Sequence, residues 1–132
     1  MSKKIKILFF LLIMAQGLHS IEEYQGKLWE NFPPATYLTG LFSDDHETGF
    51  LIINIGLFVF GLLCCAILLR TKGVYALALV WFWVILEFIN GIGHPIWSAI
   101  QASYTPGLLT APLLLLMAVL IYWQLRAEYA KN

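Results

Sequence analysis

Ionisable side chains that stand at helical spacing inside apolar sequence are the first candidates for chemistry in this chain. His19, Glu22 and Glu23 occupy positions i, i+3 and i+4 of one apolar stretch, and Gln16 precedes them by about one helical turn. At about 100° per residue, the first three side chains fall within about 100° of arc on a helix. One imidazole and two carboxylates on one helix face could bind a metal ion or transfer protons.

A second stripe of polar residues lies in a later apolar stretch. Glu87, Asn90 and His94 stand at i, i+3 and i+7, and they span only about 60° of arc on a helix. Gly91 and Gly93 remove bulk beside the stripe, which predicts the close approach of a neighbouring helix or a ligand. Ionisable side chains cost about 2.5–3.5 kcal/mol each to insert into a membrane, so they usually face the interior of a bundle and have a function.

Pro95 directly follows this second stripe. A proline inside a helix removes one backbone hydrogen bond. We therefore expect the helix to break or kink there and to free a carbonyl near His94.

The elements that must position these residues are four apolar stretches, at about residues 5–24, 50–69, 74–101 and 108–125. Each is long enough to cross a bilayer, for which a helix needs ~20 residues, and backbone groups in lipid must be paired within the helix. Only 12% of the residues are charged and 60% are hydrophobic, whereas soluble domains carry about 25% charged residues. We predict an all-α, polytopic membrane protein with one domain, residues 1–132, that forms a four-transmembrane-helix bundle with an outer loop over residues 25–49.

Basic residues set the expected orientation. With four spans, only Lys27 lies on one side of the membrane, and seven basic residues lie on the other: Lys3, Lys4, Lys6, Arg70, Lys72, Arg126 and Lys131. The positive-inside rule makes the second side the cytoplasm. We therefore expect both termini in the cytoplasm, an inner (plasma) membrane location and a site toward the outer face. The net charge of zero gives no basic field for nucleic acid.

This orientation places polar residues of all four helices in one outer layer. His19 and Glu23 lie near the outward end of the first helix, and His94 lies in the outer half of the third. Asn54 lies in the first turns of the second helix, and Thr110 begins the fourth. We expect these residues to meet at one site.

The start of the chain admits a second interpretation. The segment MSKKIKILFFLLIMAQG has a basic beginning, a short apolar run and an Ala-x-Gly ending, which is also typical of a cleaved signal peptide. Against cleavage, the polar residues after Leu18 keep helical spacing. We expect the first span to be retained, and a mature N-terminus near Leu18 would contradict the four-span architecture.

The sequence resembles the HXXEE-domain family of small membrane proteins. HxxEE alone is a weak motif, but here several motifs follow in the family's order and cover most of the chain: His19-x-x-Glu22-Glu23, Phe32-Pro33, Asn90 with His94, Tyr104-Thr105-Pro106-Gly107, and Thr110-Ala111. The resemblance implies a membrane protein of unknown function in which metal binding or enzymatic activity is expected. It agrees with the site and does not name a reaction.

Our first hypothesis is a metal-dependent membrane enzyme that acts on a membrane lipid or a small lipophilic molecule. Histidine and carboxylate ligands suit Zn, Fe or Mn, and two copies of so small a chain could pair as a homodimer to complete a pocket. The expected metal ligands are His19, Glu23, Glu87 and His94. The expected catalytic residues are Glu22, Glu87 and His94, and the expected supporting residues are Gln16, Asn54, Asn90, Tyr104 and Thr110.

Two other hypotheses stay open at this point. Buried carboxylates can donate protons in apolar pockets, which would suit a metal-free acid–base isomerase of an isoprenoid-like lipid. Intramembrane Glu and His residues also form proton relays, which would suit a proton- or cation-coupled transporter or a lipid-binding module. The apolar inner ends of the helices disfavour a path across the membrane.

Overall fold

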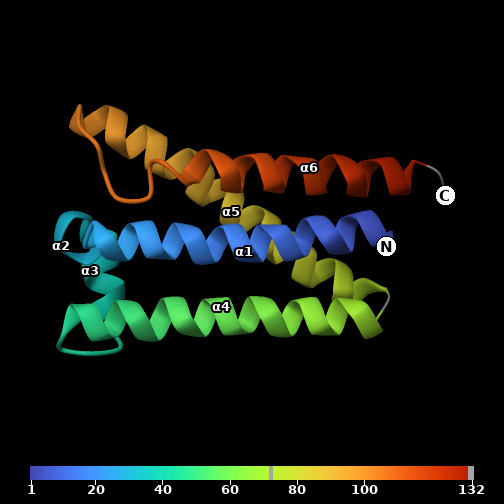
Figure 1. Cartoon of the computed structure of the whole chain (residues 1–132), viewed down its shortest axis with the longest axis horizontal. Helices are drawn as coiled ribbons and strands as arrows, with labels where there is room; N and C mark the ends of the chain where they lie inside the picture. The colour runs from blue at the N-terminus through green and yellow to red at the C-terminus, as the bar shows by residue number, and fades with distance from the viewer. Residues whose placement is uncertain (72, 131–132) are drawn as a thin grey trace.

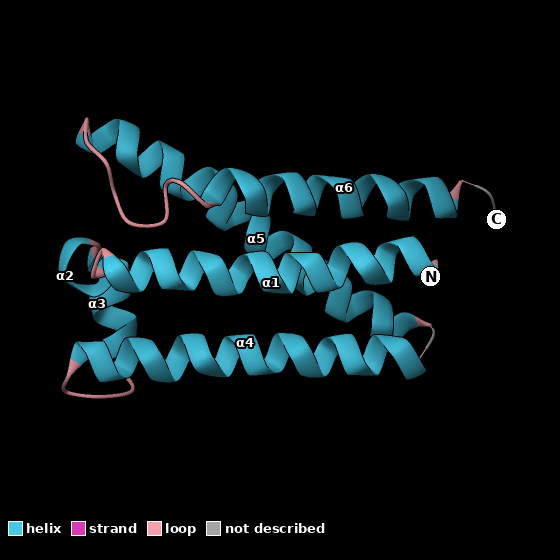
Figure 2. Cartoon of the chain, in the orientation of Figure 1, coloured by secondary structure: helices cyan, strands magenta, loops and turns pink. Residues whose placement is uncertain are grey.

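A computed structural model describes residues 1–71 and 73–130 of the chain (Figure 1). Lys72 and Lys131, which entered the charge count, lie outside these residues. The elements are α1 (Lys3–Gln25), α2 (Leu28–Asn31), α3 (Pro33–Gly40), α4 (His46–Arg70), α5 (Val74–Gln101) and α6 (Ala111–Tyr129). The described residues form helices and loops without a strand (Figure 2).

Four of these helices, α1, α4, α5 and α6, are long and apolar enough to cross a membrane. The prediction of an all-α protein with four membrane helices is therefore confirmed. In Figure 1, α6, α1 and α4 lie roughly side by side in that order, and α5 crosses behind them. Contacts between α1 and both of its neighbours, and between α5 and α6, hold the bundle together.

Local capping explains where the helices begin and end. The Asp45 carboxylate accepts a hydrogen bond from the Thr48 backbone N–H at 3.1 Å, so α4 begins at His46, four residues before the expected span. α5 ends where Ala102 adopts a left-handed conformation. Helix α6 begins at Ala111, three residues after the expected start, because residues 105–110 form a loop with Gly107 at a φ of +92°.

Helix α5 runs without a break through Pro95, so the expected break at this residue is wrong, while the expected kink and free carbonyl stay predictions. Gly91 on the same helix brings α6 close, since a Cβ built on it would lie 2.9 Å from the Leu115 backbone nitrogen and Cα. Gly93 has open space around it. The predicted close approach of a neighbouring helix is therefore confirmed at Gly91, whereas none of the described helices approaches Gly93, where the approach of a ligand stays a prediction.

The segment expected as an outer loop over residues 25–49 is largely helical. It contains α2, α3 and the first turn of α4, which lie at one end of the bundle (Figure 1). Leu28, Trp29, Ala35 and Phe50 form a small core there, covered by Phe32 and Trp97. The burial of these aromatic side chains stabilises helices that would be too short to form alone.

The main core lies in the other half of the bundle and is apolar among the described residues. Its largest members are Trp83, Phe9, Ile5, Leu12 and Ile13, all fully buried. The start of α1 and the end of α6 lie at this end of the molecule (Figure 1), where the Ser2 backbone N–H donates to Glu128 Oε1 at 2.8 Å.

Candidate metal centre

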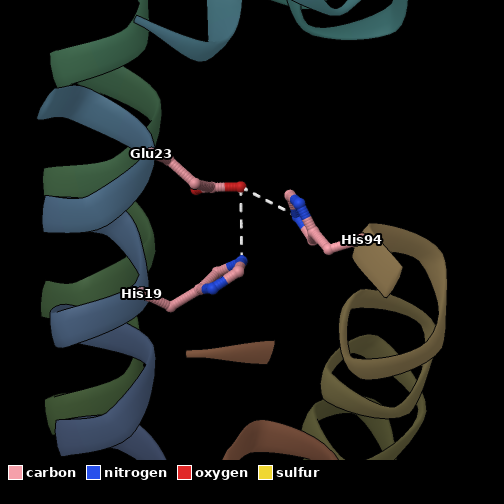
Figure 3. A group of neighbouring side chains, drawn as sticks. All are labelled: His19, Glu23 and His94. Atoms are coloured by element: carbon pink, nitrogen blue, oxygen red, sulfur yellow. Dashed lines mark ion pairs between the residues drawn. The ribbon is translucent and has the colours of Figure 1, made fainter. Parts of the chain in front are cut away.

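Two helices bring His19, Glu23 and His94 together at the end of the core nearest α2. One ligand atom from each residue can be chosen so that all three lie within 4.8 Å of one another. Glu23 Oε1 is 3.3 Å from His19 Nε2 and 3.2 Å from His94 Nε2. Figure 3 shows the carboxylate of Glu23 between the two imidazole rings, with His19 and Glu23 on α1 and His94 on α5.

The position of these residues follows from the buried face of each helix. Buried residues of α1 recur at spacings of mostly three or four: Ile5, Phe9, Leu12, Ile13, Ala15, Gln16, His19 and Glu23. Buried residues of α5 do the same: Ala76, Val80, Trp83, Val84, Glu87, Gly91, His94 and Ser98. This period is that of a helix packed on one side. His19, Glu23 and His94 therefore continue the apolar core into a polar layer, and all three are buried.

The loop between α5 and α6 covers the two imidazole rings. A Cβ built on Gly107 would lie 2.5 Å from His94 Nδ1 and 2.8 Å from His19 Cε1. A glycine is needed here for its positive φ and because the rings leave no space for a side chain. A hydrogen bond between the Ser98 and Thr105 hydroxyls fixes the start of this loop on α5.

Glu22 faces the same loop rather than the imidazole rings. Its carboxylate accepts hydrogen bonds from the Tyr104 hydroxyl at 2.7 Å, the Leu109 backbone N–H at 3.0 Å and the Thr110 backbone N–H at 2.8 Å. The Thr110 hydroxyl donates to it as well, at 2.6 Å. Although the Tyr104 ring is exposed, partial desolvation of its hydroxyl, together with the hydrogen bond to Glu22 and the negative charge of Glu22, raises the pKa of Tyr104 to about 12. Tyr104 therefore stays a donor at neutral pH.

Both histidines keep one buried ring nitrogen without a hydrogen-bond partner. These atoms are His19 Nε2 and His94 Nδ1. His19 uses its other nitrogen, Nδ1, which lies 2.7 Å from Thr110 Oγ1. A buried polar atom without a partner is rare and costly, so the free Nε2 beside the Glu23 carboxylate is a feature that the function must explain.

Glu87 lies outside this group, although it was expected among the ligands. Seven residues separate it from His94, which corresponds to about 10.5 Å along a helix. It is fully buried and accepts a hydrogen bond from Asn90 Nδ2 at 3.2 Å. One end of the Gln16 side-chain amide lies 3.1 Å from Glu87 Oε1 and 2.9 Å from its Oε2.

A chain of hydrogen bonds decides which end of the Gln16 amide faces Glu87. Asn54 Nδ2 donates to the Phe50 carbonyl at 3.1 Å, which leaves Asn54 Oδ1 to accept from the Ser20 hydroxyl at 2.8 Å. The single Ser20 proton is then used, so Ser20 can only accept from Gln16 Nε2, at 3.2 Å. With the Gln16 oxygen facing Glu87, the whole chain is satisfied when Glu87 is a neutral carboxylic acid that donates to this oxygen. In the opposite orientation Gln16 Nε2 donates to both Glu87 oxygens and the Gln16 oxygen accepts from Ser20, which suits an ionised Glu87 but leaves Asn54 Oδ1 without a donor.

The structure thus divides the candidate residues into three sets. His19, Glu23 and His94 form the group with ligand spacing. Glu22, Tyr104 and Thr110 join α1 to the loop, and Gln16, Asn54, Asn90 and Glu87 belong to a separate polar chain that crosses the bundle. Two participants were missed, Ser20 and Gly107. The signal for Ser20 was its position one turn after Gln16 on α1, whereas no local pattern places Gly107 against residues far away in the chain.

The group of three suits a metal ion in its atoms and their spacing. Two ligand atoms of a tetrahedral ion with bonds of about 2.0–2.1 Å lie about 3.3–3.4 Å apart. The two distances from Glu23 Oε1 to the imidazole nitrogens, 3.3 and 3.2 Å, are close to this value. Two histidines and one carboxylate form a ligand set of catalytic zinc sites and of non-haem iron oxygenases.

Comparison with known proteins identifies the family of the chain. A family described as "Protein of unknown function with HXXEE motif" matches residues 10–122 of the chain. No curated protein and no solved structure matches it.

Proposed function

Since the chain belongs to the family of proteins with an HXXEE motif, we propose that the shared motif is half of a metal centre, completed by His94 from α5. In this proposal His19, Glu23 and His94 bind one divalent ion, Zn, Fe or Mn. The observation that carries the proposal is the buried His19 Nε2, which lies at ion-pair distance, 3.3 Å, from the Glu23 carboxylate but in a geometry that makes no hydrogen bond. A cation between these two acceptors satisfies both.

We propose further that the protein is a membrane enzyme for a small lipophilic substrate. Three protein ligands leave a coordination position open, which is typical of catalytic rather than structural zinc sites. An ion held there would supply a Lewis acid. The protein holds the three ligands in a buried layer of the bundle. The Glu87 carboxylic acid on α5, in the same half of the bundle, would serve as a proton source.

The surroundings of the site favour a lipophilic substrate. The four spanning helices place it in a bundle with an apolar exterior. An apolar cavity of about 450 Å³ lies between α1 and α4, lined by residues such as Leu18, Ile21, Leu51, Ile55 and Phe58; the three proposed ligands are not among its lining residues. Such a cavity would accept a hydrocarbon chain from the bilayer, and Ser20 and Asn54 add a polar group to its wall.

A metal-free acid–base enzyme is the second candidate, because Glu23 also has the distances of an ion pair with both imidazoles. In that case a proton on His19 Nε2 would take the place of the ion. A transporter is less favoured, since the core at the other end of the bundle is apolar among the described residues.

Metal analysis of the full-length protein in detergent tests the proposal. The protein is incubated with a small excess of Zn, Fe(II) or Mn, and unbound metal is then removed by dialysis. Elemental analysis should find one ion per chain for at least one metal. His94→Ala should remove it, because one of three ligands is lost. His46→Ala is the matched control, since His46 lies on α4 and pairs with Thr39 instead.

Two results would contradict the metal centre. One is the absence of a stoichiometric ion in the wild-type protein with each of the three metals. The other is equal metal content in His94→Ala and the wild type. An activity that survives chelators in the first case would favour the metal-free enzyme.

A further inference from the structure

The Thr110 hydroxyl connects Glu22 to one of the proposed metal ligands. Thr110 Oγ1 lies 2.6 Å from Glu22 Oε2 and 2.7 Å from His19 Nδ1. A hydroxyl has one proton to donate. If Thr110 donates this proton to Glu22, its hydroxyl oxygen can only accept a hydrogen bond from His19 Nδ1–H. If Thr110 donates it to His19, Nδ1 must carry a lone pair.

The surroundings of Glu22 fix that direction. Its carboxylate oxygens receive hydrogen bonds from two backbone N–H groups and from the Tyr104 hydroxyl, in addition to Thr110. Three of these donors are independent of the Thr110 hydroxyl, and a carboxylate that accepts from all three acts as an acceptor only. Thr110 must then donate to Glu22 and accept from His19 Nδ1–H. In neutral His19 the lone pair is therefore on Nε2, the nitrogen beside Glu23.

We infer that Glu22 is a positioning residue, which acts through Thr110 to hold His19 in the Nδ1–H tautomer and to couple the docking of residues 104–110 to metal binding. This inference rests on the proposed function, because it assigns Glu22 a role at that metal centre. The two adjacent carboxylates of the motif then have different roles. Glu23 binds the ion, and Glu22 orients the histidine that binds it.

The coupling follows from contacts that the loop shares with the site. Glu22 binds the loop at Tyr104, Leu109 and Thr110, and Gly107 lies against both imidazole rings. If the loop leaves, His19 loses the partner that fixes its tautomer. The docked loop therefore strengthens binding of an ion to His19 Nε2. Because such coupling is reciprocal, the bound ion stabilises the docked loop by the same free energy.

Zinc affinity measured by competition with a chromophoric chelator, on the full-length protein in detergent, gives the first test. Thr110→Val removes the hydroxyl at nearly constant volume, and we expect about 10- to 100-fold weaker binding, the usual effect of losing an outer-shell partner. Thr110→Ser keeps the hydroxyl and should bind as the wild type does. Thr39→Val is the matched control, because it removes another threonine–histidine contact, to His46, away from the site.

Glu22→Gln distinguishes a positioning residue from a ligand. We expect weaker binding, while the absorption spectrum of the cobalt-loaded protein at saturation keeps the wild-type shape because the ligand atoms are unchanged. A spectrum that reports a different ligand set would overturn the inference and make Glu22 a ligand. Unchanged zinc affinity in both Thr110→Val and Glu22→Gln would overturn it too.

Nitrogen-15 NMR of the histidine side chains in the metal-free protein gives a readout that does not depend on the ion. At a pH where the imidazole ring is neutral, the His19 signals, assigned by their loss in His19→Gln, should report the Nδ1–H tautomer in the wild type and Thr110→Ser, and a tautomer mixture in Thr110→Val. The same mixture in all three proteins would overturn the inference. If the wild type binds no zinc, the proposed metal centre fails, and this NMR result alone then decides whether Glu22 and Thr110 set the tautomer.

Discussion

At the scale of single residues, Glu22 and Glu23 are neighbours in the chain but have different surroundings. Successive side chains of a helix point about 100° apart, so Glu23 faces the buried imidazoles while Glu22 faces the backbone N–H groups and hydroxyls of the loop. A carboxylate that receives several hydrogen bonds holds a loop in place, whereas one beside two imidazoles can help to bind a cation.

Tyr104 provides a pH-dependent prediction for the contact with Glu22. Because partial desolvation and the Glu22 carboxylate raise its pKa to about 12, the tyrosinate absorption near 295 nm that is lost in Tyr104→Phe should appear with a midpoint near pH 12 in the wild type. In Glu22→Gln the midpoint should fall toward the ordinary value of about 10. A wild-type midpoint near 10 would contradict the contact.

The same shift determines how alkaline pH affects stability. The folded protein favours the protonated tyrosine, so the contribution of Tyr104 is fully present below the unfolded pKa of about 10 and is lost as the pH rises toward 12. The wild type should therefore lose more stability than Tyr104→Phe between pH 9 and pH 12, as measured by thermal unfolding in detergent.

Substitutions of Glu87 test whether its side chain is a neutral carboxylic acid in the folded protein. A glutamine at this position can donate to the Gln16 oxygen and accept from Asn90, as a protonated glutamate does, so Glu87→Gln should change the free energy of unfolding by no more than about 1 kcal/mol. Glu87→Ala leaves a cavity and both partners unsatisfied, which should cost about 2–4 kcal/mol. Denaturation in mixed detergent measures both. Equal losses for the two variants would indicate an ionised Glu87.

At the scale of elements, two glycines of α5 give a matched pair for helix packing. A Cβ on Gly91 would lie 2.6 Å from Leu115 Cβ and 2.9 Å from its backbone. Gly91→Ala should therefore force α5 and α6 apart and destabilise the protein by about 1–3 kcal/mol. Gly93→Ala meets open space and should be neutral or stabilising by up to about 1 kcal/mol, because alanine favours a helix. Thermal unfolding of both variants checks this, and a larger loss for Gly93→Ala would contradict the packing.

The elements were largely predictable from sequence because hydrophobic length sets the membrane helices. The third expected span, residues 74–101, has the bounds of α5. The helices α2 and α3 were not predicted, since they depend on Trp29 and Phe50 packing together from different parts of the chain. Helical spacing does not fix that kind of contact.

The candidate site was predictable in its residue types and only partly in its grouping. Spacing placed His19 and Glu23 on one face of α1 and His94 on a stripe of α5, and these three lie together. Helical spacing shows which face of a helix a residue lies on, but not how far along the axis it lies from a second residue. Glu87 and His94 share one face of α5, yet they lie about two turns apart along it. The position of Gly107 against both rings depends on how a loop folds back over the bundle.

At the scale of the whole molecule, the two ends of the bundle differ in charge. Five described basic residues lie at the end that holds the start of α1 and the end of α6: Lys3, Lys4, Lys6, Arg70 and Arg126. The opposite end, with α2 and α3, carries Lys27 and an excess of acids, Glu30, Asp44, Asp45 and Glu47. The positive-inside rule predicts that the first end faces the cytoplasm and that the candidate metal centre lies toward the outer face.

Cysteine labelling tests this orientation. In a Cys64→Ala, Cys65→Ala background, the exposed positions Asp44→Cys and Ala130→Cys mark the two ends of the bundle. A membrane-impermeant maleimide should label Asp44→Cys in right-side-out vesicles and Ala130→Cys only after the membrane is opened, because the basic end is retained in the cytoplasm. The reverse pattern would turn the bundle over and place the centre near the cytoplasmic face, while labelling of both positions in sealed vesicles would contradict the three spans, α4, α5 and α6, that lie between them.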